Sequence, residues 1–128
     1  MADAYLIDTT MLVDFLRGKK EAKEWLERFP EGELAISVIT AAELLAGCRN
    51  KQEQRRLEEE LERYSLILAS NAISATAWEW YRQYRLSDGV GFFDCLIGAS
   101  AHHYGLVICT LNDKHFRPLP DLQVERPY

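Results

Sequence analysis

The chain has 128 residues, of which 48% are hydrophobic, and its formal net charge is −5 at pH 7. A chain of this length can bury one hydrophobic core but hardly two, so we expect a single domain over residues 1–128. The negative charge argues against a protein that holds nucleic acid on a broad basic surface.

The sequence also indicates the compartment. No apolar run approaches the roughly 20 residues of a membrane-spanning helix, and the first residues lack the basic and apolar regions of a signal peptide. We therefore expect a cytoplasmic protein with no membrane partner. Cys48, Cys95 and Cys109 are widely spaced and form no Cys-x-x-Cys pair, so we expect reduced thiols.

Short β-like runs alternate with helical patterns, which predicts an α/β fold with a mainly parallel sheet. A strand is expected over residues 5–7, followed by a helix that Asp8 caps and Gly18 ends. A second helix carries Trp25 and Leu26 on its apolar stripe.

The middle of the chain repeats this alternation. A strand is expected over residues 34–38, and Thr40 begins the next helix. The charged segment that follows keeps helical spacing at Leu57 and Leu61, and a short strand is expected over residues 66–68.

The long helix that Ser70 caps carries an aromatic stripe that includes Trp80 and Tyr81. Aromatic stripes at helical spacing are more often core than base-stacking surfaces, so we expect core packing here. The remaining predicted elements are a helix between Gly91 and Gly105, a strand over residues 106–109, a loop over residues 111–115 and an edge strand over residues 122–124.

Acidic residues lie near the junctions between predicted strands and helices. Asp8 follows the first strand, Glu43 lies just after the second, and Asp94 lies in the first turn of a late helix. Asp113 lies in the loop after the late strand. Sites in parallel sheets lie at the carboxyl ends of the strands, and hard cations such as Mg²⁺ take oxygen ligands.

Each acid also has a purely structural interpretation. Asp8 is placed to cap a helix, and Asp94 is placed to favour the positive end of one. Thr40 and Glu43 have capping-box spacing, in which the glutamate reaches back to the threonine amide. Because first-turn acids are common, position alone does not establish a metal site.

Competing chemistries are weak. His102 and His103 are adjacent on a helix and point in different directions, so they cannot form a ligand pair. The sequence has no Walker-type glycine loop, no Gly-x-Ser-x-Gly elbow and no convincing Cys/His nucleophile pair. The carboxylates are therefore the main chemical candidates.

At these same acids the sequence resembles the PIN-domain family and, within it, the VapC-type toxins. The resemblance is carried by four segments: YLIDTT (5–10), ISVITAAELLAG (36–47), FDCLIGA (93–99) and TLNDKHF (110–116). Their order and spacing extend over nearly the whole chain, which outweighs the capping interpretation of each single acid.

The resemblance implies a PIN-like three-layer α/β/α sandwich whose acids bind one or two Mg²⁺ or Mn²⁺ ions. Asp8, Glu43 and Asp94 take the metal-binding positions. Either Asn112 or Asp113 would complete the shell, directly or through water. Two matching hydroxyl positions, expected to orient a ligand or water, are Thr9 and Thr110.

The resemblance also implies a metal-dependent endoribonuclease that leaves a 5′ phosphate and a 3′ hydroxyl on a tRNA, rRNA or mRNA substrate. Bound ions reverse the local potential, which accounts for the acidic net charge. Candidate RNA contacts are Arg49, Lys114 and His115. The toxin would inhibit translation or growth, form a homodimer, and be obstructed by a VapB-like antitoxin docked among the early helices.

Two alternatives stay open from the sequence. One is a PIN nuclease that acts on DNA, or on structured RNA in processing, by the same chemistry. The other is a non-catalytic PIN-like module whose acids cap helices and whose surface binds a protein.

Overall fold

The computed structural model describes residues 5–128, which contain one parallel sheet of five strands in the order β3-β2-β1-β4-β5. The strands are β1 (Tyr5–Ile7), β2 (Leu34–Ser37), β3 (Ser65–Ile67), β4 (Val107–Cys109) and β5 (Val124–Glu125). The helices are α1 (Thr9–Leu16), α2 (Lys20–Leu26), α3 (Val38–Ala46), α4 (Lys51–Leu61), α5 (Asn71–Asp88), α6 (Phe92–Tyr104) and α7 (Asp113–Phe116).

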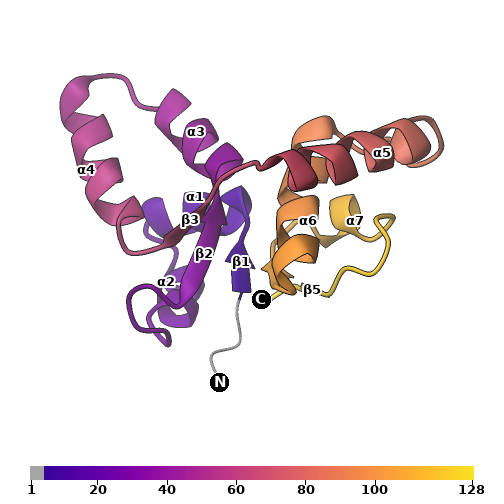
Figure 1. Cartoon of the computed structure of the whole chain (residues 1–128). Coiled ribbons are helices and arrows are strands. Elements are labelled where there is room, and N and C mark those ends of the chain that lie inside the picture. Colours follow the sequence, from indigo (N-terminus) through magenta and orange to yellow (C-terminus); the bar gives the residue numbers. More distant parts are fainter. Residues whose placement is uncertain (1–4) are drawn as a thin grey trace.

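Helices cover both faces of this sheet. Figure 1 shows α1 to α4 on one side of the strands and α5 to α7 on the other. Leu6 and Ile108 belong to the core under α5 and α6, whereas the next residues, Ile7 and Cys109, belong to the core under α1 and α2. Successive strand residues point to opposite faces, so the predicted three-layer α/β/α sandwich is confirmed.

The central strand β1 marks the place where the chain changes direction across the sheet. From β1 the chain adds β2 and β3 on one side, then crosses to add β4 and β5 on the other. Ligands of open α/β sheets bind at such a switch point, at the carboxyl ends of the strands. Ile7 lies opposite Cys109 in the register, so Asp8 and Thr110 emerge together at this edge.

The start of α3 differs from the prediction. Ser37 is its N-cap, and the Ser37 Oγ accepts a hydrogen bond of 3.0 Å from the Ile39 amide. Thr40 therefore lies inside the helix and is fully buried. The predicted helix start at Thr40 is wrong, because Ser37, three residues earlier, supplies the capping oxygen.

Other boundaries shift by small amounts. The predicted loop after β4 contains the short helix α7, which begins at Asp113. The edge strand begins at Val124, and β3 ends at Ile67. The helix α5 has the predicted cap, since the Ser70 Oγ accepts from the Ile73 amide.

The aromatic stripe on α5 lies mainly in the core, as predicted. Trp80 is buried, and Tyr81 packs against the same cluster. Cys95 and Cys109 are buried free thiols, and Cys48 is a partly buried one. Within residues 5–128, no helix combines the length and apolar character needed to cross a membrane.

Candidate active site

Asp8 lies directly after β1, where it is 4% exposed. Although it occupies the N-cap position of α1, its side chain makes no capping hydrogen bond. Its Oδ2 instead accepts hydrogen bonds from the hydroxyls of Thr110, at 2.7 Å, and Thr10, at 3.1 Å. The capping interpretation of Asp8 is therefore wrong.

The two hydroxyls bind the same carboxylate oxygen of Asp8. Among the described residues, no hydrogen bond uses its Oδ1, and no fully buried side-chain oxygen or nitrogen lacks a partner. Oδ1 therefore keeps access to solvent. A buried carboxylate with one fixed oxygen and one accessible oxygen is well suited to bind a cation.

Glu43 lies on the next strand-to-helix unit along the chain, within α3. Its side chain is exposed, and its Oε1 accepts a hydrogen bond of 2.9 Å from the Thr9 hydroxyl. The same hydroxyl lies 3.2 Å from the Thr40 hydroxyl. The Glu43 carboxylate thus binds a side chain on α1 rather than the Thr40 amide, so the alternative capping-box interpretation is wrong.

Asp94 lies in the first turn of α6, with a side chain that is 29% exposed. Burial raises the pKa of Asp94 above its ordinary value. His115, whose Nδ1 lies 3.2 Å from the Asp94 Oδ2, opposes this rise, whereas the charges of Asp8 and Glu43 add to it. The three acids are therefore close enough to interact electrostatically, although three separate parts of the chain carry them.

The donor set of this edge fits a hard divalent cation. All three predicted ligands supply carboxylate oxygens, and their like charges disfavour one another until a cation is present. As the side chains stand, no three His, Cys, Asp or Glu groups in residues 5–128 converge on one point. Convergence of three side chains is not required for Mg²⁺, which commonly binds one or two carboxylates and keeps water in its remaining positions.

Asn112 and Asp113, the two candidates for a fourth metal-binding group, have different surroundings. The Asp113 Oδ2 accepts a hydrogen bond of 2.5 Å from Arg117, and its Oδ1 lies 3.6 Å from the Arg126 guanidinium. The hydrogen bond from Arg117 is the main cause that lowers the pKa of Asp113. Asn112 is exposed, and its side chain makes no hydrogen bond to the α7 amides that follow it.

The predicted RNA contacts fall into two places. Lys114 and His115 are exposed on α7, and His115 contacts Asp94 directly. Arg49 lies beyond the far end of α3, where it pairs with Glu53 at 3.0 Å. The structure therefore brings His115, but not Arg49, into contact with a candidate metal ligand, and Lys114 precedes His115 on α7.

Sequence reasoning identified Thr9 and Thr110 but missed Thr10. Thr9 and Thr110 do contact the predicted acids, and Thr10 contacts Asp8 as well. The available signal was a second hydroxyl two residues after the acid, within reach of its carboxylate once a helix begins there.

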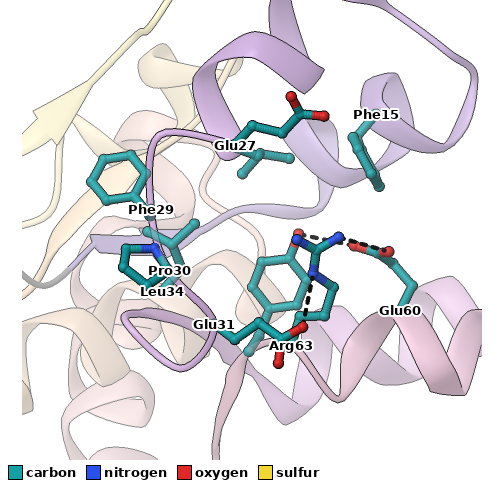
Figure 2. Close-up of a pocket in the computed structure, with 10 residues that line it drawn as sticks. Phe15, Glu27, Phe29, Pro30, Glu31, Leu34, Glu60 and Arg63 are labelled. Carbon is teal, nitrogen blue, oxygen red and sulfur yellow. Dashed lines mark hydrogen bonds and ion pairs between the residues drawn. The ribbon is translucent and has the colours of Figure 1, made fainter.

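A separate pocket lies between α2 and the end of α4, and Figure 2 shows its lining. Arg63 lies beside it, with ion pairs of 3.8 Å to Glu31 and 3.7 Å to Glu60. None of the predicted site residues lines this pocket, and its volume of about 20 Å³ has room for about one water molecule. It does not compete with the carboxylate edge as a substrate site.

Comparison with known proteins identifies the family of this chain. A family model described as "PIN domain" matches residues 5–122. The chain belongs to the PIN-domain family. Relatives include Ribonuclease VapC10 of Mycobacterium tuberculosis, which is 37% identical over 113 residues that cover 87% of this chain and 84% of the relative. Ribonuclease VapC19 of the same species is 38% identical over 121 residues, with coverage of 92% and 96%.

Comparison with solved structures also finds this fold. A toxin–antitoxin complex from Klebsiella pneumoniae contains a chain that superposes with a TM-score of 0.81 and 31% identity. The match covers 97% of this chain and 98% of that one. The predicted PIN-like architecture therefore agrees with the family assignment.

Proposed function

We propose that this PIN domain is a VapC-type toxin, a metal-dependent endoribonuclease that hydrolyses RNA phosphodiesters and so inhibits translation or growth. The observation that carries the proposal is that threonine hydroxyls bind the Asp8 and Glu43 carboxylates. The alternative interpretation would have these carboxylates cap helices. Asp94 interacts electrostatically with both acids. Similarity to named VapC ribonucleases over most of the chain supports the reaction class.

Asp8, Glu43 and Asp94 would hold Mg²⁺ or Mn²⁺, which when bound activates water and stabilises negative charge on the phosphodiester. Asp8 would offer its accessible Oδ1 while Thr10 and Thr110 hold Oδ2. Thr9 restricts the rotation of the Glu43 carboxylate. We further propose that Asn112 supplies the fourth polar group, because both oxygens of Asp113 face arginines.

RNA binding by an acidic protein needs local positive charge. Lys114 and His115 lie on α7, and His115 contacts the Asp94 carboxylate. We propose that both residues contact phosphate oxygens of the bound strand. Bound divalent ions would add further positive potential at the same edge. A broad basic surface is therefore unnecessary for this substrate.

The partner we propose is a VapB-like antitoxin, because solved structures similar to this chain include toxin–antitoxin complexes. A groove between α1, α3 and α4, lined by Leu16, Leu44, Cys48, Arg56 and Leu57 among others, is a suitable docking place. Leu16 is exposed there, so a partner would cover apolar surface. The homodimer implied by the family resemblance is part of the same proposal.

The test compares matched RNA and DNA strands of the same sequence. We expect the purified protein to cleave RNA with Mg²⁺ or Mn²⁺ and to lose this activity with a chelator. Asp8→Asn should lose at least about a hundredfold, or about 2.7 kcal/mol of transition-state stabilisation. Cleavage of DNA alone would indicate another PIN nuclease, and absence of both cleavage and metal binding would indicate a non-catalytic module.

Sequencing of RNA 5′ ends after controlled expression identifies the substrate class. One dominant cut in a tRNA or rRNA would support the toxin role. Scattered cleavage throughout the RNA pool would contradict the selectivity that inhibition of translation through one target requires.

A further inference from the structure

Thr10 connects two distant parts of the candidate site. Its Oγ1 donates a hydrogen bond of 3.1 Å to the Asp8 Oδ2 and accepts one of 3.1 Å from the Leu111 amide. Leu111 follows β4 and lies 101 positions along the chain from Thr10. One hydroxyl on the first turn of α1 therefore contacts both a predicted metal ligand and the loop at the end of another strand.

Thr110 makes the corresponding connection from the other side. Its Oγ1 donates to the Asp8 Oδ2 at 2.7 Å and accepts from the Asn112 amide at 2.9 Å. A threonine hydroxyl has one proton, and a carboxylate is a stronger acceptor than a second hydroxyl. In both threonines the proton is thus directed to Asp8, although the two hydroxyl oxygens lie only 3.4 Å apart.

The direction of these hydrogen bonds holds the Asp8 carboxylate in one orientation. Two backbone amides donate to two threonines, and both threonines donate to one carboxylate oxygen. Rotation of the Asp8 carboxylate would break both connections, so Oδ2 stays on the protein side and Oδ1 stays accessible. The same hydrogen bonds position residues 110–112, which include the fourth-position candidate Asn112.

We propose that Thr10 is a positioning residue of the active site, which orients the Asp8 carboxylate and joins it to the loop that carries Asn112. The inference rests on the proposed role of Asp8 as a metal ligand. A threonine that only stabilised the start of α1 would affect folding stability, but it would not affect cation affinity or the Leu111 amide.

The experiment uses Thr10→Val, which keeps the shape and removes the hydroxyl, and Thr10→Ser, which keeps the hydroxyl. Thr76→Val on α5 is the matched control, since no side-chain hydrogen bond of Thr76 is found in residues 5–128. Mn²⁺ binding is measured by calorimetry without RNA. Exchange of the Leu111 amide hydrogen is measured by NMR without metal.

We expect Thr10→Val to weaken Mn²⁺ binding by about 10- to 100-fold, the usual effect of removing a group that orients a metal ligand. Its Leu111 amide should exchange faster than in the wild type. Thr10→Ser and Thr76→Val should keep the wild-type values of both quantities.

A folded Thr10→Val protein with wild-type Mn²⁺ affinity would overturn the proposal. If this variant fails to fold, Thr10→Ala, which introduces no new methyl group, replaces it under the same criterion. The wild-type protein gives an independent check, because an unprotected Leu111 amide would also overturn the proposal. Absence of Mn²⁺ binding by the wild type would instead contradict the proposed function, while the amide measurement would still test the Thr10 contact.

Discussion

The Thr9 hydroxyl on α1 donates a hydrogen bond of 2.9 Å to the Glu43 carboxylate on α3. This contact separates the two interpretations that the sequence allows for Glu43. A capping glutamate would bind an amide of its own helix, whereas this carboxylate binds a residue next to Asp8. Glu43 thus faces the carboxyl edge of the sheet, where its charge adds to that of Asp94.

Glu43→Gln should keep the fold and lose cleavage by at least about a hundredfold, or about 2.7 kcal/mol of transition-state stabilisation. The glutamine oxygen can still accept from Thr9, but the negative charge for the cation is absent. Single-turnover cleavage and urea unfolding measure the two effects. Near-normal cleavage by Glu43→Gln, together with unfolding of Glu43→Ala, would show that Glu43 only joins α3 to α1 through Thr9.

Asp8→Asn should affect both activity and stability. The single amide oxygen can accept from Thr10 and Thr110, but an NH₂ group then replaces the accessible Oδ1 and cannot bind a cation. Hydrogen bonds to a charged acceptor are stronger than neutral ones, so we expect a loss of about 1–2 kcal/mol of unfolding free energy. Cleavage should fall at least about a hundredfold, or about 2.7 kcal/mol. A fully active, equally stable variant would contradict the assignment of Asp8.

Mg²⁺ or Mn²⁺ should raise the melting temperature of the wild type, because the folded state presents the grouped carboxylates and the unfolded state does not. At an ion concentration of about one hundred times Kd, the stabilisation should be about 2.7 kcal/mol. Differential scanning calorimetry measures this effect, with Asp8→Asn as the control that should respond less. Equal responses of both proteins would place the ion elsewhere.

Asp94→Asn should stabilise the metal-free protein at neutral pH. The pKa of Asp94 is raised in the folded state, so folding is penalised whenever this side chain is ionised. The penalty is present above the folded pKa and disappears as the pH falls below the unfolded pKa. The advantage of Asp94→Asn should therefore vanish in acid, as urea unfolding at a series of pH values would test. A variant that is less stable than the wild type at neutral pH would contradict this expectation.

Asp113→Asn should have the opposite stability dependence and a milder effect on cleavage. The pKa of Asp113 is lowered from its ordinary value of 3.8, so its ion pairs stabilise the fold above that pH and are lost as the pH falls through the lower, folded value. Arg117 and Arg126 are well exposed, which limits the size of this effect.

Asn112→Ala is the comparison variant for cleavage. If Asn112 completes the site, Asn112→Ala should reduce the rate more than Asp113→Asn does. A larger loss for Asp113→Asn, without a matching loss of stability, would assign the fourth role to Asp113.

Local patterns predicted much of the fold. The alternation of strands and helices, together with the acids after β1 and β2, is enough to place Asp8 and Glu43 at one edge of the sheet. The first strand was predicted with its observed bounds, because a short apolar run ends there at a polar segment. The roles of these acids as ligands stay predictions.

What the sequence did not predict depends on contacts between distant residues. Asp113 pairs with Arg126, and Thr10 binds the Leu111 amide, although neither pair follows a local period. The capping error at Thr40 has a different cause, since Ser37 offered an equally good cap three residues earlier. By sequence Ser37 and Thr40 are equally acceptable helix caps, and only the packing that buries Thr40 distinguishes them.

The span between Asp8 and Thr110 sets the order in which a newly made chain can assemble this site. Their hydrogen bond joins positions 102 residues apart, and β1 pairs with β4 only after that distance has been synthesised. At about 5–20 residues per second, a ribosome needs about 5–20 s to cover this interval. Asp8 therefore lacks one of its two hydroxyl partners throughout this interval. The proposed cation site is therefore completed only after Thr110 has been synthesised and β4 has paired with β1.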